Sequence, residues 1–345
     1  MADAYTKAGV DITAGDQAVQ KMSNAVKSTY TDGVLAGIGG FASIFQLPQG
    51  YQEPVLIAGS DGVGSKLLLA QAADQHKTIG QDLVAMIVND ILAQGAKPLF
   101  MLDYMGIDKV APDKVAQIVS GIAMASRASK MALIGGETAE LPDMYRKDEY
   151  DLAGFAVGIA EKNQILDGSR VKTGDVLLGL ASSGLHSNGF SLVRKLLLTD
   201  AHKTWQDLDG DLQKELLTAT RIYVRSLLPL LPTGQIHGLA HITGGGLLEN
   251  LPRMFNKQLA AVINWQSWPI PAIFQRLQQT GQLSKQDMLR TFNLGIGMLA
   301  AVSPDQAQAV KAQLQKSGER VYIVGQIIDR SNDGPAVDFH GEAPW

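Results

Sequence analysis

Three short segments between residues 59 and 140 combine glycine with acidic side chains. They are residues 59–66 (GSDGVGSK), 88–90 (VND) and 135–140 (GGETAE). Glycine lets main-chain N–H groups approach a phosphate, and carboxylates bind the Mg²⁺ that accompanies phosphates. The first segment differs from the common P-loop, because Lys66 is followed by Leu67 and not by serine or threonine. Together the three segments predict an ATP site of an uncommon type.

Each of these acidic segments also has a purely structural explanation. Asp61-Gly62 is the commonest signature of a hairpin turn, and Gly135-Gly136 could simply end a strand. A turn requires no further acids, however, and Asp90 and Glu137 follow in the other two segments. We therefore favour a metal and phosphate site, with Asp61 placed to reach a metal ion. Residues 37–41 (GIGGF) either close over a triphosphate or form a mobile surface loop.

Two loops in the second half of the chain are typical of anion sites. Residues 182–190 (SSGLHSNGF) combine hydroxyls and glycine amides with the start of a predicted helix. The alternative is that Ser187 or Asn188 merely caps that helix. Residues 241–246 (HITGGG) add the imidazole of His241. A lone histidine is more often structural, but the three glycines that follow favour a functional one.

The apolar periodicity predicts an α/β or α+β fold that positions these loops. In the first half we expect strands at 54–59, 98–103, 132–134 and 152–159 and helices at 81–96 and 112–130. In the second half we expect strands at 176–181, 260–263, 295–302 and 321–328 and helices at 190–198, 215–231 and 271–280. On the helix at 81–96, Asp82, Asn89 and Asp90 fall on one side. That side faces either a ligand cavity or, alternatively, solvent.

Composition narrows the function classes. The 345 residues favour two domains, and a turn-rich stretch at 161–174 would link them. The chain has no cysteine, which excludes disulfides, thiolate nucleophiles and iron–sulfur clusters, and its six histidines lack zinc-ligand spacing. A net charge of −4 argues against a nucleic-acid partner. Without a signal-like start or a long apolar run, we expect a cytoplasmic protein with no membrane partner.

Long motifs in sequence order, which cover nearly the whole chain, carry a family resemblance. The chain resembles the phosphoribosylformylglycinamidine cyclo-ligases, also called aminoimidazole ribonucleotide synthetases, which act in purine biosynthesis. The motifs are TKAGVDI at 6–12, SDGVGSK at 60–66, residues 78–96, GGETAEL at 135–141, DLAGF at 151–155, residues 182–194, TRIYV at 220–224, residues 240–252 and RTFN at 290–293. Their number and order make them far more specific than one glycine loop.

The resemblance implies a two-domain α/β (α+β) fold and a specific activity. The N-terminal domains of two subunits would pair their sheets into a barrel across a homodimer. Residues 1–165 would bind ATP and Mg²⁺ and dimerise, and residues 170–345 would bind substrate; a K⁺ requirement stays open. The implied ligase forms a C–N bond: it closes formylglycinamidine ribonucleotide to 5-aminoimidazole ribonucleotide and releases ADP and phosphate. A transient contact with the neighbouring pathway enzyme also stays open.

The resemblance further implies a role for individual residues. The metal ligands would be Asp61, Asp90 and Glu137. The nucleotide would be bound by Gly39, Gly40, Ser60, Gly62, Gly64, Ser65, Lys66 and Asn89. The substrate would be bound by Ser187, Asn188, Thr243, Gly244, Gly245 and Gly246. The catalytic candidates are Lys27, which would move with the glycine loop, and His186 and His241, of which we prefer His241 as the proton relay.

Small departures from the family pattern leave two alternatives to weigh. Ser60 and Ser65 stand where threonine is common, and Ala42 stands where glycine is common, but every acid is present. One alternative is another ATP-dependent enzyme of the same superfamily, such as a thiamine-monophosphate kinase or a selenophosphate synthetase. The second is an inactive nucleotide-binding homologue. The retained acids argue against the second, and the absence of cysteine argues against a selenophosphate synthetase.

Overall fold

A computed structural model describes residues 11–343 of the chain. The residues divide into two compact units. Unit 1 comprises Met1–Ile91 and Pro98–Ile159, and unit 2 comprises Leu92–Lys97 and Ala160–Trp345. Both units mix helices with strands, which confirms the predicted α/β class. None of the helices in the described part of the chain is long and apolar enough to cross a membrane.

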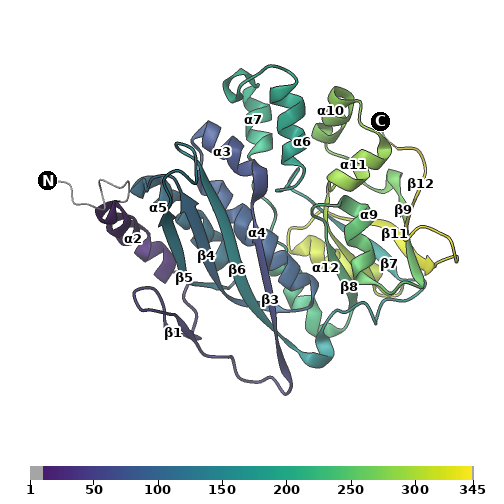
Figure 1. Ribbon diagram of the computed structural model, residues 1–345. Coiled ribbons are helices and arrows are strands. Elements are labelled where there is room, and N and C mark those ends of the chain that lie inside the picture. Colours follow the sequence, from purple (N-terminus) through teal and green to yellow (C-terminus); the bar gives the residue numbers. More distant parts are fainter. Residues whose placement is uncertain (1–10, 344–345) are drawn as a thin grey trace. The chain divides into compact units, whose positions relative to one another are not determined.

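Unit 1 is built on a four-stranded sheet (Figure 1). Its elements are α2 (Ile12–Lys27), β1 (Val34–Ala36), β2 (Ile44–Phe45), β3 (Pro54–Gly62), α3 (Leu67–Ala73), α4 (Lys77–Ala93), β4 (Lys97–Ile107), α5 (Pro112–Ala128), β5 (Ala132–Glu140) and β6 (Tyr150–Glu161). The strand order is β3-β6-β4-β5, and β4 runs parallel to β5. Strands β3 and β5 are therefore the two edges. Strands β1 and β2 form a separate antiparallel ribbon.

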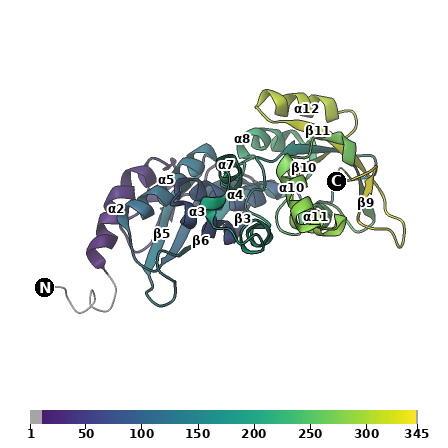
Figure 2. The ribbon, with the colours of Figure 1, turned by 90° about the horizontal axis from the view of Figure 1, so that it is seen from above.

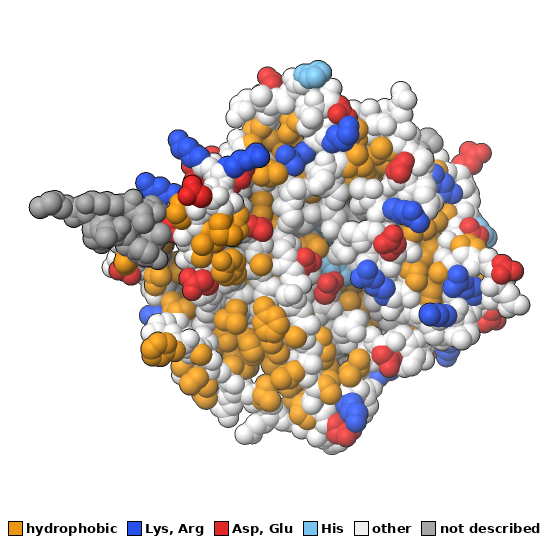
Figure 3. Space-filling view, viewed as in Figure 1, with side chains coloured by type: hydrophobic (Ala, Val, Ile, Leu, Met, Phe, Trp, Pro, Cys, Tyr) orange, Lys and Arg blue, Asp and Glu red, His pale blue; other side chains and the backbone are white. Residues whose placement is uncertain are grey.

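One face of this sheet is covered by helices, and the other is open. Helix α4 is buried from residue 82 to residue 89, and its Ile87 lies against Gly59 of β3 and Gly154 of β6. Helix α2 packs along α5, as Figures 1 and 2 both show. On the opposite face, Leu56 is 56% exposed and Phe155 is 43% exposed. Figure 3 shows hydrophobic side chains gathered over this part of unit 1.

Unit 2 contains a six-stranded sheet with the order β12-β9-β11-β7-β10-β8. Its strands are β7 (Val176–Ala181), β8 (Ile236–His241), β9 (Leu259–Asn264), β10 (Ile296–Val302), β11 (Val321–Asp329) and β12 (Val337–His340). Its α-helices are α6 (Phe190–Arg194), α7 (Gly210–Leu216), α8 (Val224–Leu227), α9 (Gly246–Asn250), α10 (Ala272–Gly281), α11 (Lys285–Thr291) and α12 (Ala307–Lys316). Strand β10 is buried along its whole length, and helices lie on both faces of this sheet (Figure 2).

The structure differs from the sequence-based expectations at three places. The apolar run at 54–59 predicts a buried strand, but this strand is not buried, because its residues alternate between the helix-covered face and the open face. The purely structural explanations of two segments also fail: Asp61-Gly62 forms no hairpin turn and Gly135-Gly136 does not end a strand, because β3 and β5 continue through them. The expected helix at 215–231 is split into α7 and α8 by residues 217–223, which form neither helix nor strand.

Candidate active site

Unit 1 contains a cavity of about 1060 Å³. Apolar side chains of α2 and of the sheet form much of its wall, and the glycine-rich residues 37–43 and the end of β5 complete it. Gly39, Gly40 and Glu137, all predicted as site residues, line this cavity. Its volume is at the upper end of the roughly 300–1,000 Å³ typical of small-molecule sites. The cavity is therefore large enough for a nucleotide.

The glycine loop is anchored at its base and open at its tip. Ile38 donates its N–H to the Tyr30 hydroxyl at 2.9 Å, and Ser43 Oγ donates to the Ile134 carbonyl at 2.5 Å. At the tip, Gly39 has φ +110°, a left-handed conformation that side-chain-bearing residues rarely adopt, with open space around its Cα. The side chain of Phe41 is fully exposed. This geometry lets main-chain amides of the loop face a bound anion.

Asp103 is a cavity residue to which we assigned no role from sequence. It lies on β4 opposite Gly136 of β5, where a Cβ at position 136 would collide with its carboxylate. Burial raises the pKa of Asp103 to about 7. The signal in the sequence was the position of Asp103 at the end of the predicted strand 98–103. Asp103 therefore adds a second carboxyl group, after that of Glu137, to the residues that line the cavity.

The residues of the first glycine–acid segment lie around β3 and α4. Ser60, Asp61 and Gly62 belong to β3, and Gly64, Ser65 and Lys66 form the short 3-10 turn that follows. Lys66 Nζ and Asp82 Oδ1 are 2.9 Å apart, and both side chains are inaccessible to solvent. Burial lowers the pKa of Lys66, and the charge of Asp82 opposes this shift. A contact between Lys66 and a phosphate would therefore require this ion pair to open.

The polar residues of α4 have different environments. Asp82 and Asn89 are completely buried, so the solvated-surface alternative does not hold for them. Asp90 is exposed. Lys27, at the end of α2, is also exposed, and its neighbour Val26 lines the cavity.

The three predicted metal ligands do not form one cluster within a chain. Asp61 is on edge strand β3 and Glu137 is on edge strand β5, with β6 and β4 between them. Among the described residues, no group of three histidine, aspartate or glutamate side chains is placed to hold a metal ion. A Mg²⁺ role for each of these acids therefore remains a prediction.

In unit 2, the two predicted anion loops lie next to each other. Asn188 Oδ1 is 3.7 Å from the position that a Cβ on Gly244 would occupy. Gly244 is exposed, and Asn188 and Thr243 are half-buried, so solvent reaches part of each of these residues. Ser187 is buried, and so is Gly246, whose Cα packs against the Leu289 carbonyl. Gly245 has φ +89° at the start of α9.

Two buried asparagines hold these loops, and we assigned neither a role from sequence. Asn250 Nδ2 donates to the carbonyls of Gly244 at 3.0 Å and Gly246 at 2.8 Å. Asn293 Nδ2 donates to the Gly184 carbonyl at 2.9 Å. Asn293 lies in the RTFN motif and Asn250 in the motif at 240–252, which was the available signal. Because these loop carbonyls accept hydrogen bonds from the buried asparagines, the main-chain N–H groups of the loops can face outward, toward an anion.

Both candidate histidines are buried. His186 has φ +62°, and its Nε2 accepts the Ser183 N–H at 3.2 Å, which assigns the proton of the neutral ring to Nδ1. His186 also packs against Gly297, where a Cβ would collide with the ring. His241 ends β8 and is 5% exposed. Each imidazole is thus integrated into the core beside one anion loop.

Solved structures share this fold. The thiamine-monophosphate kinase of Stenotrophomonas maltophilia aligns with a TM-score of 0.67 and 22% identity, over 94% of this chain and 96% of that one. A hydrogenase maturation protein HypE in complex with ATP aligns with a TM-score of 0.65 and 19% identity, over 93% of this chain and 88% of that one. At these identities the similarity establishes the fold alone.

Sequence comparisons identify the family. Residues 42–160 match the model of the AIR synthase related protein, N-terminal domain, and residues 172–338 match that of its C-terminal domain. The phosphoribosylformylglycinamidine cyclo-ligase of Shouchella clausii is 54% identical, over 95% of this chain and 96% of its own length. The cyclo-ligase of a Geobacillus species is 51% identical, over 99% of both chains. The chain therefore belongs to the phosphoribosylformylglycinamidine cyclo-ligase family, as its sequence motifs predicted.

Proposed function

We propose that this chain catalyses the ATP-dependent ring closure of formylglycinamidine ribonucleotide to 5-aminoimidazole ribonucleotide, with release of ADP and phosphate. The observation that carries the proposal is the 54% identity to a cyclo-ligase over 95% of the chain. Both halves of the chain contribute to this similarity. A nucleotide-sized cavity in unit 1 and an accessible anion-binding loop pair in unit 2 are the parts that such an enzyme requires.

The chemistry explains why ATP is consumed. The formyl oxygen of the substrate is a poor leaving group, so the γ-phosphoryl group of ATP is transferred to it and ADP leaves. The neighbouring amidine nitrogen then attacks the formyl carbon, and the C–O bond breaks to release inorganic phosphate. The nitrogen loses a proton as the ring closes. Because nucleophile and electrophile belong to one molecule, the protein must chiefly orient the substrate and neutralise charge.

We assign the nucleotide to residues 1–165. The loop with Gly39 and Gly40 would cover the triphosphate, and Glu137 and Asp103 would lie beside it. A HypE structure of the same fold was solved with ATP, which supports the use of ATP by this chain. Lys27 would approach from the end of α2. Residues 11–343 of one chain offer no cluster of three acidic or histidine side chains for the Mg²⁺ that accompanies ATP, so we derive no step from it.

We assign the substrate to residues 170–345. The side chain of Asn188 and the amides of the 243–246 loop would bind the ribose 5-phosphate. His241, at the end of β8 and next to this loop, is our candidate for accepting the proton that the nitrogen loses. His186 is the alternative.

We also propose that the enzyme acts as a homodimer in the cytoplasm. The open face of the unit 1 sheet carries exposed apolar side chains on β3, β4 and β6, which a second copy could cover. A dimer could also bring β3 of one protomer close to β5 of its partner, uniting acids that lie on opposite edges of one sheet.

The first experiment measures ADP and 5-aminoimidazole ribonucleotide after incubation with Mg²⁺-ATP, with and without formylglycinamidine ribonucleotide. We expect substrate-dependent ADP release, matched one to one by product. Asp61→Asn should lose about 10²-fold of the rate, because a neutral amide replaces a carboxylate that would hold the Mg²⁺ accompanying the phosphates. The control is Asp338→Asn, an exposed aspartate of β12, which should keep the wild-type rate.

Two results would contradict the proposal. If well-folded wild-type protein releases no substrate-dependent ADP but phosphorylates thiamine monophosphate, the chain is another enzyme of the superfamily. If it binds ATP and turns over neither substrate, it is a nucleotide-binding homologue without activity.

A further inference from the structure

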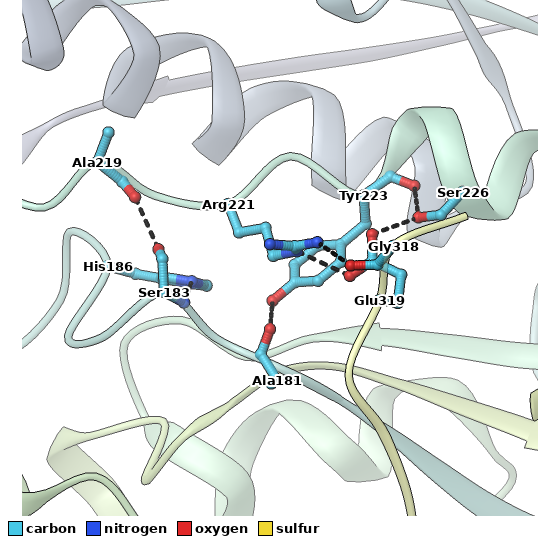
Figure 4. A network of polar contacts seen from close by, with 9 residues as sticks. All are labelled: Ala181, Ser183, His186, Ala219, Arg221, Tyr223, Ser226, Gly318 and Glu319. Atoms are coloured by element: carbon cyan, nitrogen blue, oxygen red, sulfur yellow. Dashed lines mark hydrogen bonds and ion pairs between the residues drawn. The ribbon is translucent and has the colours of Figure 1, made fainter. Parts of the chain in front are cut away.

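Residues 217–223 of unit 2 lie along the substrate loop at 182–189. They form neither helix nor strand, and three hydrogen bonds tie them to that loop and to the end of β7. Tyr223 donates to the Ala181 carbonyl at 2.9 Å, and Ser183 Oγ donates to the Ala219 carbonyl at 2.7 Å (Figure 4). The hydroxyls of Ser187 and Thr220 are 2.8 Å apart. Residues 217–223 therefore support the loop.

A buried carboxylate anchors the same segment from its other side. Arg221 Nε donates to Glu319 Oε2 at 2.7 Å, and its Nη2 donates to the Gly318 carbonyl at 3.0 Å. The second oxygen of Glu319 accepts from Ser226 Oγ at 2.8 Å. Figure 4 shows this network directly beside Tyr223 and Ser183. Because the Glu319 side chain is only 4% exposed, its charge needs the guanidinium of Arg221 to stay in place.

Within this support, the hydroxyl of Thr220 contacts the loop directly. Its side chain is completely buried, and its hydroxyl contacts Ser187, the residue before the accessible Asn188. A serine hydroxyl can rotate among several directions, so a fixed partner decides which way it points. Thr220 is that partner, and the ion pair between Arg221 and Glu319 fixes the position of the segment that carries it.

We propose that Thr220 is a positioning residue for substrate binding, and that the Arg221–Glu319 pair holds it in register with Ser187. This inference rests on the proposed function, in which the loop at 182–189 binds the phosphate of the substrate. Thr220 does not touch the substrate itself. It keeps the Ser187 hydroxyl and the adjoining Asn188 in the geometry that binds the anion.

The test compares Thr220→Val with Thr220→Ser. Valine keeps the shape of threonine and removes the hydroxyl, so we expect KM for formylglycinamidine ribonucleotide to rise about tenfold. The values of kcat and of KM for ATP should stay within about twofold of wild type, because the substitution changes only the binding of formylglycinamidine ribonucleotide. Thr220→Ser should restore the wild-type KM. The matched control is Thr218→Val, an exposed threonine of the same segment whose hydroxyl donates to Lys214.

A second variant tests the anchor without touching the loop. Glu319→Gln keeps the shape of the side chain and weakens its bond to Arg221, so KM for the ribonucleotide should rise by about threefold.

Several outcomes would overturn the inference. They are an unchanged KM in Thr220→Val or in Glu319→Gln, a Thr220→Ser variant as impaired as Thr220→Val, and a fall of kcat together with a rise of both KM values. A wild-type protein without turnover would overturn the proposed function and this inference with it. Wild-type turnover with an unchanged KM in Thr220→Val would overturn this inference alone.

Discussion

At the scale of single residues, buried His76 of unit 1 has a hydrogen-bond partner at each ring nitrogen. His76 Nδ1 lies 2.8 Å from the Tyr150 hydroxyl, and Nε2 lies 2.8 Å from Asp74 Oδ1. In the neutral ring, Nε2–H donates to the aspartate and Nδ1 accepts from the tyrosine hydroxyl. Burial lowers the pKa of His76, although the hydrogen bond to Asp74 opposes this shift, and Lys114 lowers the pKa further.

The sign of this shift predicts how pH affects stability. Below the ordinary histidine pKa of 6.5, the unfolded chain binds a proton that folded His76 resists, so the free energy of unfolding falls as pH falls. We expect His76→Gln to lower Tm at pH 7.5 by a few degrees, because about 1–2 kcal/mol of hydrogen bonding is lost. Between pH 7.5 and pH 5 the variant should lose less Tm than wild type. Thermal unfolding at several pH values measures both effects.

Tyr150→Phe is the control for the histidine prediction. It removes the tyrosine hydrogen bond but leaves His76 able to titrate. The Tm of Tyr150→Phe should therefore still fall as the pH falls below 7. A His76→Gln protein with the same pH dependence as wild type would show that other groups cause it.

At the scale of elements, one carboxylate connects three parts of unit 1. Glu140, at the end of β5, accepts the N–H of Asp11 through Oε2 and the N–H of Val110 through Oε1. Asp11 caps α2, since its side chain accepts from Ala14 N–H at 3.0 Å. Val110 precedes α5. Because α2 forms a wall of the unit 1 cavity, Glu140 fixes the position at which that wall begins.

We therefore expect Glu140→Gln to loosen α2 before it affects the rest of unit 1. The amide keeps one acceptor oxygen for two N–H donors, and one lost charge-assisted hydrogen bond costs about 1.5–3 kcal/mol. Hydrogen exchange followed by mass spectrometry should show faster exchange in residues 12–27 and unchanged exchange in buried α4.

Glu137→Gln is a matched control for this experiment. It changes an exposed glutamate three residues away on the same strand and should leave exchange in α2 unchanged. Equal effects of the two variants, or no effect of Glu140→Gln, would refute the connecting role of Glu140.

The positions of these acids show what sequence can and cannot predict. Local periodicity predicted β7 at 176–181 correctly, because its apolar run and flanking turns are local signals. The separation of Asp61 from Glu137 has no local signal, because β6 pairs between β3 and β4 through contacts distant in the chain. The roles of Glu140 and Thr220 likewise depend on partners 129 and 33 residues away. The motifs contain both Glu140 and Thr220, but no local signal indicates which distant residues they contact.

At the scale of the whole molecule, the open sheet face of unit 1 is the feature that a single chain leaves unexplained. Tyr104 on β4 is 43% exposed and Phe155 on β6 is also 43% exposed, with Leu56 on β3 at 56%. These apolar side chains occupy three adjacent strands of one sheet, opposite the face that α4 covers. Large contiguous apolar surfaces of this kind mark association sites. The proposed homodimer would bury them.

This argument predicts that a charge at the centre of the face separates the dimer. Phe155→Glu would bury a carboxylate without a partner at the interface, at a cost of several kcal/mol that a few apolar contacts cannot offset. Light scattering after size exclusion should give twice the chain mass of 36.9 kDa for wild type and a smaller mass for the variant. Ile323→Glu, which alters a similarly exposed apolar residue of β11 in unit 2, should remain dimeric.

If ATP turnover needs acids from both protomers, the activity of Phe155→Glu should fall in proportion to its dimer fraction, and activity should return at high protein concentration. A fully active monomer would exclude a shared site, and a dimeric Phe155→Glu protein would place the interface elsewhere.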